Sequence, residues 1–457
     1  MLQNSTPLRV FTKVPPFLCT CLLLFGTFSF AVENNQSSAY SAKPELFFPE
    51  LSKVLTKLNQ DAPFLLEQQE LVRQGHSEKL IAESSKGFKI GINAQAHSLH
   101  EDRPNQGFYH RYRTMASIHL KKPLYHWGAL DAASRISQLS EESSKTRLTA
   151  LQRSYRSKIR NDYLDLMILG YEQDLAKESL ALARENEQDL IKRRDLGKIP
   201  DLTVYESTLA RLKQSVKLSD LRRKSDYQAR VFQMETGYRE KLTFTKTSEF
   251  TIFCEKHSFS GSVPVLISQL SSPELAYLKN EIEMEGNKIK IADADLKPKL
   301  NLIGALYQDQ VDLANSSETL ERNNLLVGIE AQWAIWDSSR SKGMKEAARS
   351  RKRMNEITVE RTAKALRLMV EDLRNQISSL SEEIEVNRQL VKVAGNRYEK
   401  SIIEFQQNRI TPTLHFEARL TLDQSKLDLA KTVSQYLKAR DLYDERTTFN
   451  NKSSWRR

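Results

Sequence analysis

The chain has 457 residues, of which 39% are hydrophobic and 28% are charged, and it contains only 15 Gly and 13 Pro. A mean hydropathy of -0.54 excludes a helical membrane protein, although the chain is long enough for a large folded core. The scarcity of Gly and Pro argues against many short elements joined by turns and favours long helices. The net charge of +11 is spread along the sequence, so it indicates no particular partner.

Residues 1–31 have the three parts of a secretory signal peptide: a basic start, a short apolar core and a cleavage site of small residues. Ser29 and Ala31 occupy positions −3 and −1 of that site. An uncleaved anchor helix is the alternative, but the apolar run is shorter than the ~20 residues that a membrane-spanning helix needs. The mature chain would keep one cysteine, Cys254, and therefore form no internal disulfide.

The mature sequence repeats itself at an offset of 210 residues that becomes 211 partway along. Pro63 falls on Pro273 at the first offset, and residues 197–200 fall on residues 408–411 at the second. Each repeat predicts a helix, two strands, a very long helix and a return helix. The predicted divisions are a signal peptide (1–31), a first repeat (32–236), an irregular connecting segment (237–271), a second repeat (272–447) and a polar tail (448–457).

Two segments in each repeat alternate between apolar and polar residues. In the first repeat Phe88 and Ile90 alternate with polar side chains, and in the second repeat Leu325 and Val327 do so. This period predicts strands that have one apolar face and one more polar face. The polar candidates for lining a barrel are Lys89, Asn93, Gln95, His119, Lys121, Glu330 and Gln332.

These strands could form soluble hairpins that rest on helices, or they could cross a membrane. Each is near the ~9 to 11 residues of a tilted crossing, the chain has an export signal, and aromatic residues gather at the strand ends. We therefore favour the membrane. Four strands cannot close a wide barrel, and open strand edges are not tolerated in lipid, so several chains must contribute. Three copies would give twelve strands, an even number within the known range.

A very long helix follows each pair of strands. Residues 129–196 contain no proline and would extend ~100 Å as one helix. Gly197 and Pro200 mark the turn into a shorter return helix, and Asn408 and Pro412 mark the corresponding turn of the second repeat. Because the return helices are only about half as long, we expect the helices before the strands, near 62–86 and 272–297, to stack end to end with them.

Three motifs resemble the TolC family of outer-membrane efflux and secretion channels. The junctions Pro123-Leu124-Tyr125 and Trp333-Ala334-Ile335-Trp336-Asp337 resemble its W-P-[LI]-F-D-G-G element, although the glycine pair is reduced to Gly128 in the first and missing from the second. The turns that begin at Gly197 and Asn408 are similar to its G-x-[IV]-[ST]-x-x-[DE]-[VL] helix turn. Residues 292–298, Ala-Asp-Ala-Asp-Leu-Lys-Pro, are similar to its helix end before a strand.

The resemblance implies a mainly helical fold with a small β part, in which long antiparallel helices form an α-barrel. It implies a homotrimer with a twelve-stranded β-barrel in outer-membrane lipid, a periplasmic adaptor and an inner-membrane pump. The function implied is passive export, in efflux or type I secretion. Family members often have an aspartate one turn into the return helix, where this chain has Thr203 and Leu414. Glu206 and Glu417 are the nearest carboxylates, and each is either part of a tip gate or an ordinary solvated residue.

The sequence contains none of the motifs on which we would base an enzymatic function. There is no Walker loop, no H-E-x-x-H and no cysteine pair in the mature chain, so we expect neither catalysis nor a cofactor. Nucleic-acid binding is not expected, because the basic residues lack a matching aromatic stacking surface. An exported coiled-coil scaffold or adhesin remains the alternative function. Five of the eight histidines lie in or beside the first hairpin, and we expect no metal there: His97, His100, His110, His119 and His126.

Overall fold

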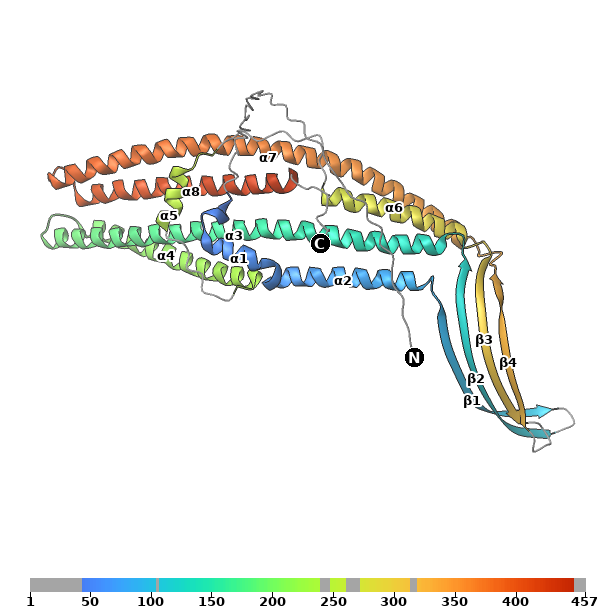
Figure 1. Cartoon of the computed structure of the whole chain (residues 1–457). Helices are drawn as coiled ribbons and strands as arrows, with labels where there is room; N and C mark the ends of the chain where they lie inside the picture. Colours follow the sequence, from blue (N-terminus) through green and yellow to red (C-terminus); the bar gives the residue numbers. More distant parts are fainter. Residues whose placement is uncertain (1–42, 104–106, 239–246, 260–271, 313–318, 448–457) are drawn as a thin grey trace, which may run out of the picture. The chain divides into compact units, whose positions relative to one another are not determined.

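The computed structural model describes residues 43–103, 107–238, 247–259, 272–312 and 319–447. The expected signal peptide and polar tail lie outside these residues. The described chain is mainly helical with one small sheet, which confirms the predicted fold class (Figure 1). None of the helices in the described ranges has the length and apolar character that a membrane crossing requires.

Helices, strands and one short 3-10 helix follow one another in an order that occurs twice. From α2 to α4 and from α6 to α8 the chain passes through a helix, two strands, a very long helix and a return helix. The elements are η1 (Pro44–Leu46), α1 (Pro49–Asp61), α2 (Pro63–Ser84), β1 (Lys89–Arg103), β2 (Gly107–Tyr125), α3 (Ala129–Asp195), α4 (Asp201–Thr236), α5 (Thr247–Lys256), α6 (Pro273–Ala294), β3 (Lys299–Asp312), β4 (Thr319–Gln332), α7 (Arg340–Gln406) and α8 (Pro412–Thr447).

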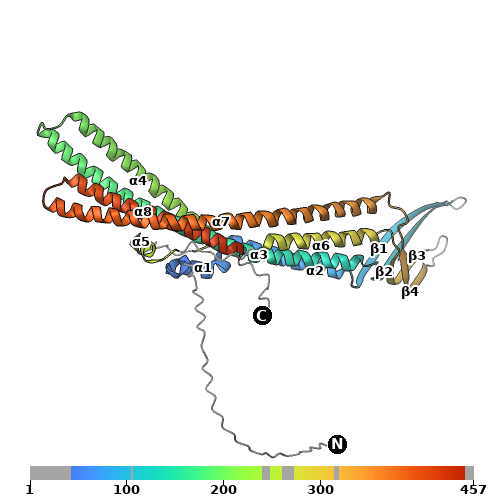
Figure 2. The same cartoon turned by 90° about the horizontal axis from the view of Figure 1, so that it is seen from above.

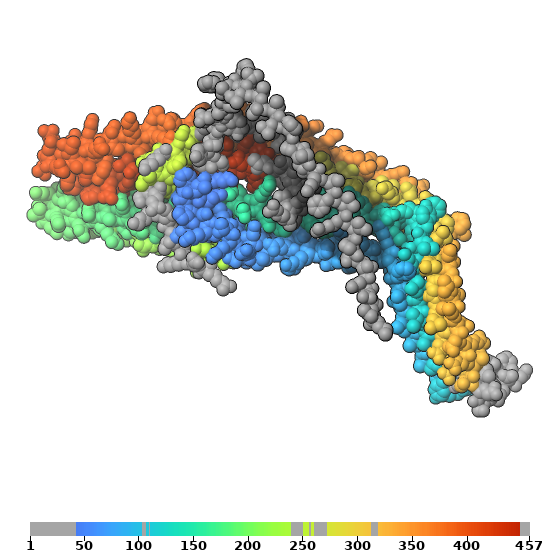
Figure 3. All heavy atoms as spheres, viewed as in Figure 1, coloured from blue at the N-terminus to red at the C-terminus, as the bar shows by residue number. Residues whose placement is uncertain are grey.

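The four strands form one antiparallel sheet in the order β1-β2-β3-β4, with β1 and β4 at its edges. They are 14 to 19 residues long, so the expected length of about ten was wrong. The backbone ladder continues beyond the apolar stretch into polar residues, because its hydrogen bonds do not depend on side-chain character. In the described part of the chain no helix packs along either face of the sheet, and Figure 3 shows one open face.

Both long helices have 67 residues and end in the same way. Gly197 and Asn408 adopt left-handed φ angles of 69° and 53°. The N–H of Gly197 donates to the Arg194 carbonyl at 2.8 Å, and the N–H of Asn408 donates to the Phe405 carbonyl at 2.9 Å. Pro200 and Pro412 then stand at the starts of α4 and α8. The helix boundaries expected from these residues are confirmed.

The helices lie side by side in a fixed order. Near the sheet the order is α2-α3-α6-α7, and toward the helix turns it is α4-α3-α8-α7 (Figure 2). The end of α4 meets the start of α2, where Gly237 lies against the Asp61 carbonyl. The end of α8 meets the start of α6 through an ion pair of 2.8 Å between Arg446 and Glu274. The expected end-to-end stacking is therefore present in both halves.

The main hydrophobic core lies where α1 and α5 pack on the long helices. Both short helices were missed by the sequence analysis, and α5 lies within the segment expected to be irregular. Its fold follows from Phe250, Phe253 and Cys254, whose spacing puts three buried side chains on one helix face. The spacing of four buried residues explains α1 in the same way: Leu51, Val54, Leu55 and Leu58.

Candidate functional site

The strand register separates the sheet into two faces of different chemistry. Ile90 pairs with Leu120 and Ile92 with Ile118, so these apolar residues share one face, on which Ile92 is 73% exposed. An exposed apolar face of this kind calls for a nonpolar environment. All seven predicted lining residues belong to the opposite face by register: Lys89, Asn93, Gln95, His119, Lys121, Glu330 and Gln332.

The polar face is organised by ion pairs and hydrogen bonds that cross the strands. Lys121 of β2 contacts Glu330 of β4 at 2.5 Å, and Asn301 of β3 donates to the same Glu330 oxygen at 3.2 Å. Arg113 of β2 forms a bidentate ion pair with Asp309 of β3. Its Nε donates to Oδ1 at 2.9 Å and its Nη2 donates to Oδ2 at 2.8 Å. The sequence analysis did not select Asn301 or Asp309, because only the strand register brings Asn301 to Glu330, 29 residues away, and Asp309 to Arg113, 196 residues away.

Tryptophan side chains fasten the sheet to the helices. The indole N–H of Trp127 donates to the Pro298 carbonyl at 2.8 Å, and that of Trp333 donates to the Leu296 carbonyl at 3.0 Å. Ile335 and Trp336 follow, and both are about 80% exposed. Large aromatic residues with one polar atom are typical of the boundary between lipid and water.

The two gate candidates lie at the opposite end of the long helices. Glu206 in α4 and Glu417 in α8 are both exposed, about one turn beyond the helix turns. Within the described part of one chain, neither carboxylate forms an ion pair with another residue. A single chain therefore does not bring them together.

His415 also lies near the second helix turn, and the sequence analysis missed it. Its ring stacks on Phe405 with centroids 5.1 Å apart and on Tyr398 at 5.4 Å. Its Nδ1 is 3.0 Å from the Ser401 hydroxyl oxygen. These contacts fix the start of α8 against the end of α7. The helical spacing of the aromatic residues around the turn is the signal from which these contacts of His415 could have been predicted.

A row of ion pairs joins α3 to α8. Glu178 contacts Arg419 at 3.1 Å, Glu172 contacts Lys431 at 2.6 Å, and Asp165 contacts Lys438 at 2.5 Å, with the acidic member on α3 each time. Burial and the nearby Glu178 carboxylate raise the pKa of Asp423, which shares Arg419. The row fixes the order of the helices, since it joins elements from the two halves of the chain.

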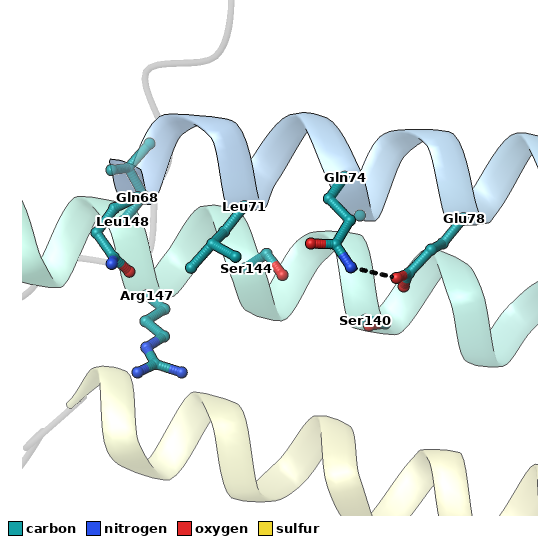
Figure 4. A pocket seen from close by; sticks show the side chains of 9 residues that line it. Gln68, Leu71, Gln74, Glu78, Ser140, Ser144, Arg147 and Leu148 are labelled. Carbon is teal, nitrogen blue, oxygen red and sulfur yellow. Dashed lines mark hydrogen bonds between the residues drawn. The ribbon is translucent and has the colours of Figure 1, made fainter. Parts of the chain in front are cut away.

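Shallow hollows lie between the helices on the surface of the described residues. The one in Figure 4 has a volume of about 210 Å³ and lies between α2 and α3, where Gln74 donates to Glu78 at 2.9 Å. Its lining includes two serines and two glutamines, and none of the lining residues is a histidine or a cysteine that could activate a nucleophile. Among the described residues, no three His, Cys, Asp or Glu side chains are grouped to hold a metal.

Residues 267–442 match the family model described as outer membrane efflux protein. The match covers less than half of the chain and shows that this part is similar to that family. The matched residues include β3, β4, α7 and most of α8, which carry half of the sheet and the second helix turn. No curated protein sequence matches the chain significantly.

Solved structures of outer membrane channels share the fold of the chain. The Campylobacter jejuni CmeC channel aligns with a TM-score of 0.74 at 13% identity, over 95% of this chain and 96% of that one. The Neisseria gonorrhoeae MtrE channel, solved in its open state, aligns at 0.69 and 12% identity over 87% and 89%. Vibrio cholerae VceC aligns at 0.67 and 15% identity over 87% and 96%. The fold is therefore that of these channels along nearly the whole chain.

The match to the outer membrane efflux protein model bears on two expectations from the sequence. The resemblance to the TolC family is confirmed by the family match. The matching family model and the similar solved structures are those of outer membrane proteins, which agrees with the expected outer-membrane location. The division into two repeats and the roles of individual residues stay predictions.

Proposed function

We propose that three copies of this chain close into a channel that serves as a passive conduit for export across the periplasm and the outer membrane. The observation that carries the proposal is that the chain has two complementary open sides. One side carries β1, α2 and α4, and the other carries β4 and α7. Each copy can therefore place its β4 and α7 side against the β1, α2 and α4 side of the next copy. Such head-to-tail contacts generate a ring.

The edge strands require this closure. β1 and β4 each present unpaired backbone groups along one side, and these groups cannot remain unpaired in lipid. Pairing β4 of one copy with β1 of the next removes every edge. Three copies give twelve strands, which is an even number within the range of known barrels.

The open helical sides support the same arrangement. On α4, Leu202, Tyr205 and Leu209 follow each other at three- and four-residue steps and are 58 to 67% exposed. On α7, Val386 and Val393 are 56% and 66% exposed, on the side away from the buried residues of that helix. Apolar stripes at this spacing are typical of helices that pack against a partner.

In this ring the polar face of the sheet would line a water-filled lumen, and the apolar face would contact lipid. Lys121, Glu330 and Arg113 would then face the path of exported compounds. A conduit of this kind supplies no energy, so the proposal includes a periplasmic adaptor and an inner-membrane pump. This arrangement is that of a tripartite efflux or type I secretion system.

We further propose Glu206 and Glu417 as candidates for a carboxylate gate near the helix turns. In a trimer each position occurs three times, so exposed carboxylates that lie apart in one chain could approach around a narrow opening. Such rings attract cations. The helix turns at Gly197, Pro200, Asn408 and Pro412 would form the rim of this opening.

Single-channel conductance in a planar bilayer tests the conduit. The purified wild-type protein should give discrete conductance steps, and it should migrate as a heat-modifiable trimer after extraction from outer membrane. Recovery as a monomer in the soluble periplasmic fraction would instead support the scaffold or adhesin.

The same recordings test the gate. Glu206→Ala and Glu417→Ala should weaken block by divalent cations while leaving trimer formation unchanged. Unchanged block in both variants would remove these two residues from the gate without affecting the conduit proposal.

A further inference from the structure

Two histidines face each other across the first hairpin. His100 of β1 is the register partner of His110 of β2, and their ring centroids are 4.6 Å apart with the planes tilted by 57°. Nε2 of His100 lies 3.1 Å from Nδ1 of His110. Both residues are exposed. The adjacent ring of Tyr112 contacts His110 edge-on at 4.7 Å.

The separation of these two nitrogens suits a shared metal ion. Two imidazole nitrogens bound at roughly 2.0–2.1 Å to one ion are about 2.9 Å apart at a right angle and about 3.4 Å apart at a tetrahedral angle. The observed 3.1 Å lies between these values. To bind one ion, the two rings must rotate until the lone pairs of these nitrogens point to it. The terminal torsion of histidine has a broad range that allows this rotation.

We propose that His100 and His110 form a two-histidine site for a divalent transition-metal ion such as Cu²⁺ or Zn²⁺. Imidazole nitrogen is a preferred ligand of these ions. The Ser98 hydroxyl oxygen lies 3.2 Å from Nδ1 of His110, at the edge of the same site. Water completes the coordination, and the bound ion links β1 to β2 at the end of the hairpin remote from the helices.

The other histidines of this hairpin do not form such a pair. His97 and His100 are three residues apart on a strand, so they lie on opposite faces of the sheet. The ring of His119 lies against Gly91, where an added Cβ would be 2.4 Å from Nε2. His126 Nε2 is 2.9 Å from the Asn301 side-chain oxygen. The site therefore comes from strand pairing and not from the spacing of histidines in the sequence.

The site depends only on the pairing of β1 with β2, and it is independent of the channel proposal. On β1 the apolar residues of this face end at Ala96. The pair of His100 and His110 lies two register positions beyond Ser98, between the exposed rings of Tyr112 and Phe108 on β2. Aromatic rings of this kind are typical of the boundary between lipid and water, so we place the two exposed histidines at this boundary, where ions in water can reach them.

Electron paramagnetic resonance of bound Cu²⁺ tests the proposal. The mature protein, purified in detergent without a histidine tag, is loaded with one equivalent of Cu²⁺ per chain. The wild-type spectrum should show coupling to two imidazole nitrogens. His100→Gln and His110→Gln should each lose one of these couplings and bind Cu²⁺ at least about tenfold more weakly.

His97→Gln is the matched control, because it removes a histidine from the same strand but from the other face. It should keep the wild-type spectrum. An unchanged circular dichroism spectrum in each variant shows that the protein is still folded. Copper bound at the chain terminus is common to all variants and cancels in the comparison. The proposal is wrong if the wild-type spectrum lacks a second imidazole, or if His97→Gln changes it as much as His100→Gln does.

Discussion

Among single residues, Gly237 combines two constraints at the point where α4 meets the segment between α1 and α2. Its φ is 68°, and an added Cβ would lie 2.2 Å from the Asp61 carbonyl oxygen. Gly237→Ala should therefore lower the free energy of unfolding by at least about 1–2 kcal/mol, through left-handed strain together with a backbone clash. The midpoint of urea unfolding measures this loss.

Gly170→Ala is the control for this substitution. Gly170 lies inside α3, and no heavy atom lies within 4 Å of an added Cβ. Alanine there should stabilise the helix by about 0.5–1 kcal/mol. A Gly237→Ala protein as stable as Gly170→Ala would show that α4 does not need the close approach to Asp61.

Glu141 is a residue whose ionisation links α3 to α2. Lys145 is 2.6 Å from its carboxylate, Lys79 is 3.1 Å away and His76 is 3.3 Å away. These partners, Lys145 foremost, lower the pKa of Glu141 from about 4.5 to about 2 against the opposing effect of burial. A lowered pKa in the folded state means that the carboxylate stabilises the fold above about pH 4.5, and that this contribution is lost as the pH falls toward 2.

Glu141→Gln should accordingly destabilise the protein by about 1–3 kcal/mol at pH 7, because it removes the charge from buried ion pairs. The difference from wild type should shrink as the pH falls from 4.5 to 2. Unfolding midpoints measured across this range give the comparison. Glu142→Gln, a change at the exposed neighbour, should have a small effect at every pH, and an equal effect of both changes would contradict the role of the buried group.

Among the elements, α5 depends on a few aromatic contacts for its position. Phe253 stacks with Phe250 and lies 4.5 Å from the ring centroid of Phe47, and Arg388 of α7 donates to the Cys254 carbonyl at 3.0 Å. Phe253→Ala should cost about 3–5 kcal/mol of local stability and release α5 before the long helices unfold. Hydrogen exchange should increase in residues 247–259 and remain unchanged near the helix turns.

Ile252→Ala provides the comparison for this experiment, because Ile252 is the adjacent residue of α5 and is 46% exposed. It should leave the exchange rates nearly unchanged. Equal acceleration in both variants would mean that α5 is not held by its buried aromatic side.

The contrast between α3 and α5 shows how far the sequence predicts this fold. The 67-residue helices were predictable, because absence of proline and a left-handed residue at the end are local signals that tertiary contacts do not override. The ten-residue α5 was not predictable from the sequence, because a helix this short is stabilised by a core that is built from distant segments. The polar face of the sheet was predictable from period two, whereas the ion pair between Arg113 and Asp309 required the register of strands from different halves.

For the whole molecule, the exposed stripe on α4 is the feature through which copies would associate in the proposed ring. Leu209 is 58% exposed on the side of α4 that faces away from its buried residues Val204 and Leu218, so a neighbouring copy is the available partner. In the proposed ring, Leu209→Asp would place a charge in the contact with α7 of the next copy. It should weaken association of the trimer at least about tenfold, or about 1.4 kcal/mol for each contact. Native mass spectrometry in detergent, over a series of protein concentrations, measures the fraction of trimer.

Lys217→Asp is the matched control, since it introduces the same side chain at an exposed position of α4 about a quarter turn away from the stripe. It should leave the trimer intact. Val393→Asp, on the opposing stripe of α7, should weaken the trimer as Leu209→Asp does, because both changes affect the same contact from its two sides. If Leu209→Asp and Lys217→Asp have the same effect, α4 does not form the contact between copies, and the strand edges alone would have to close the ring.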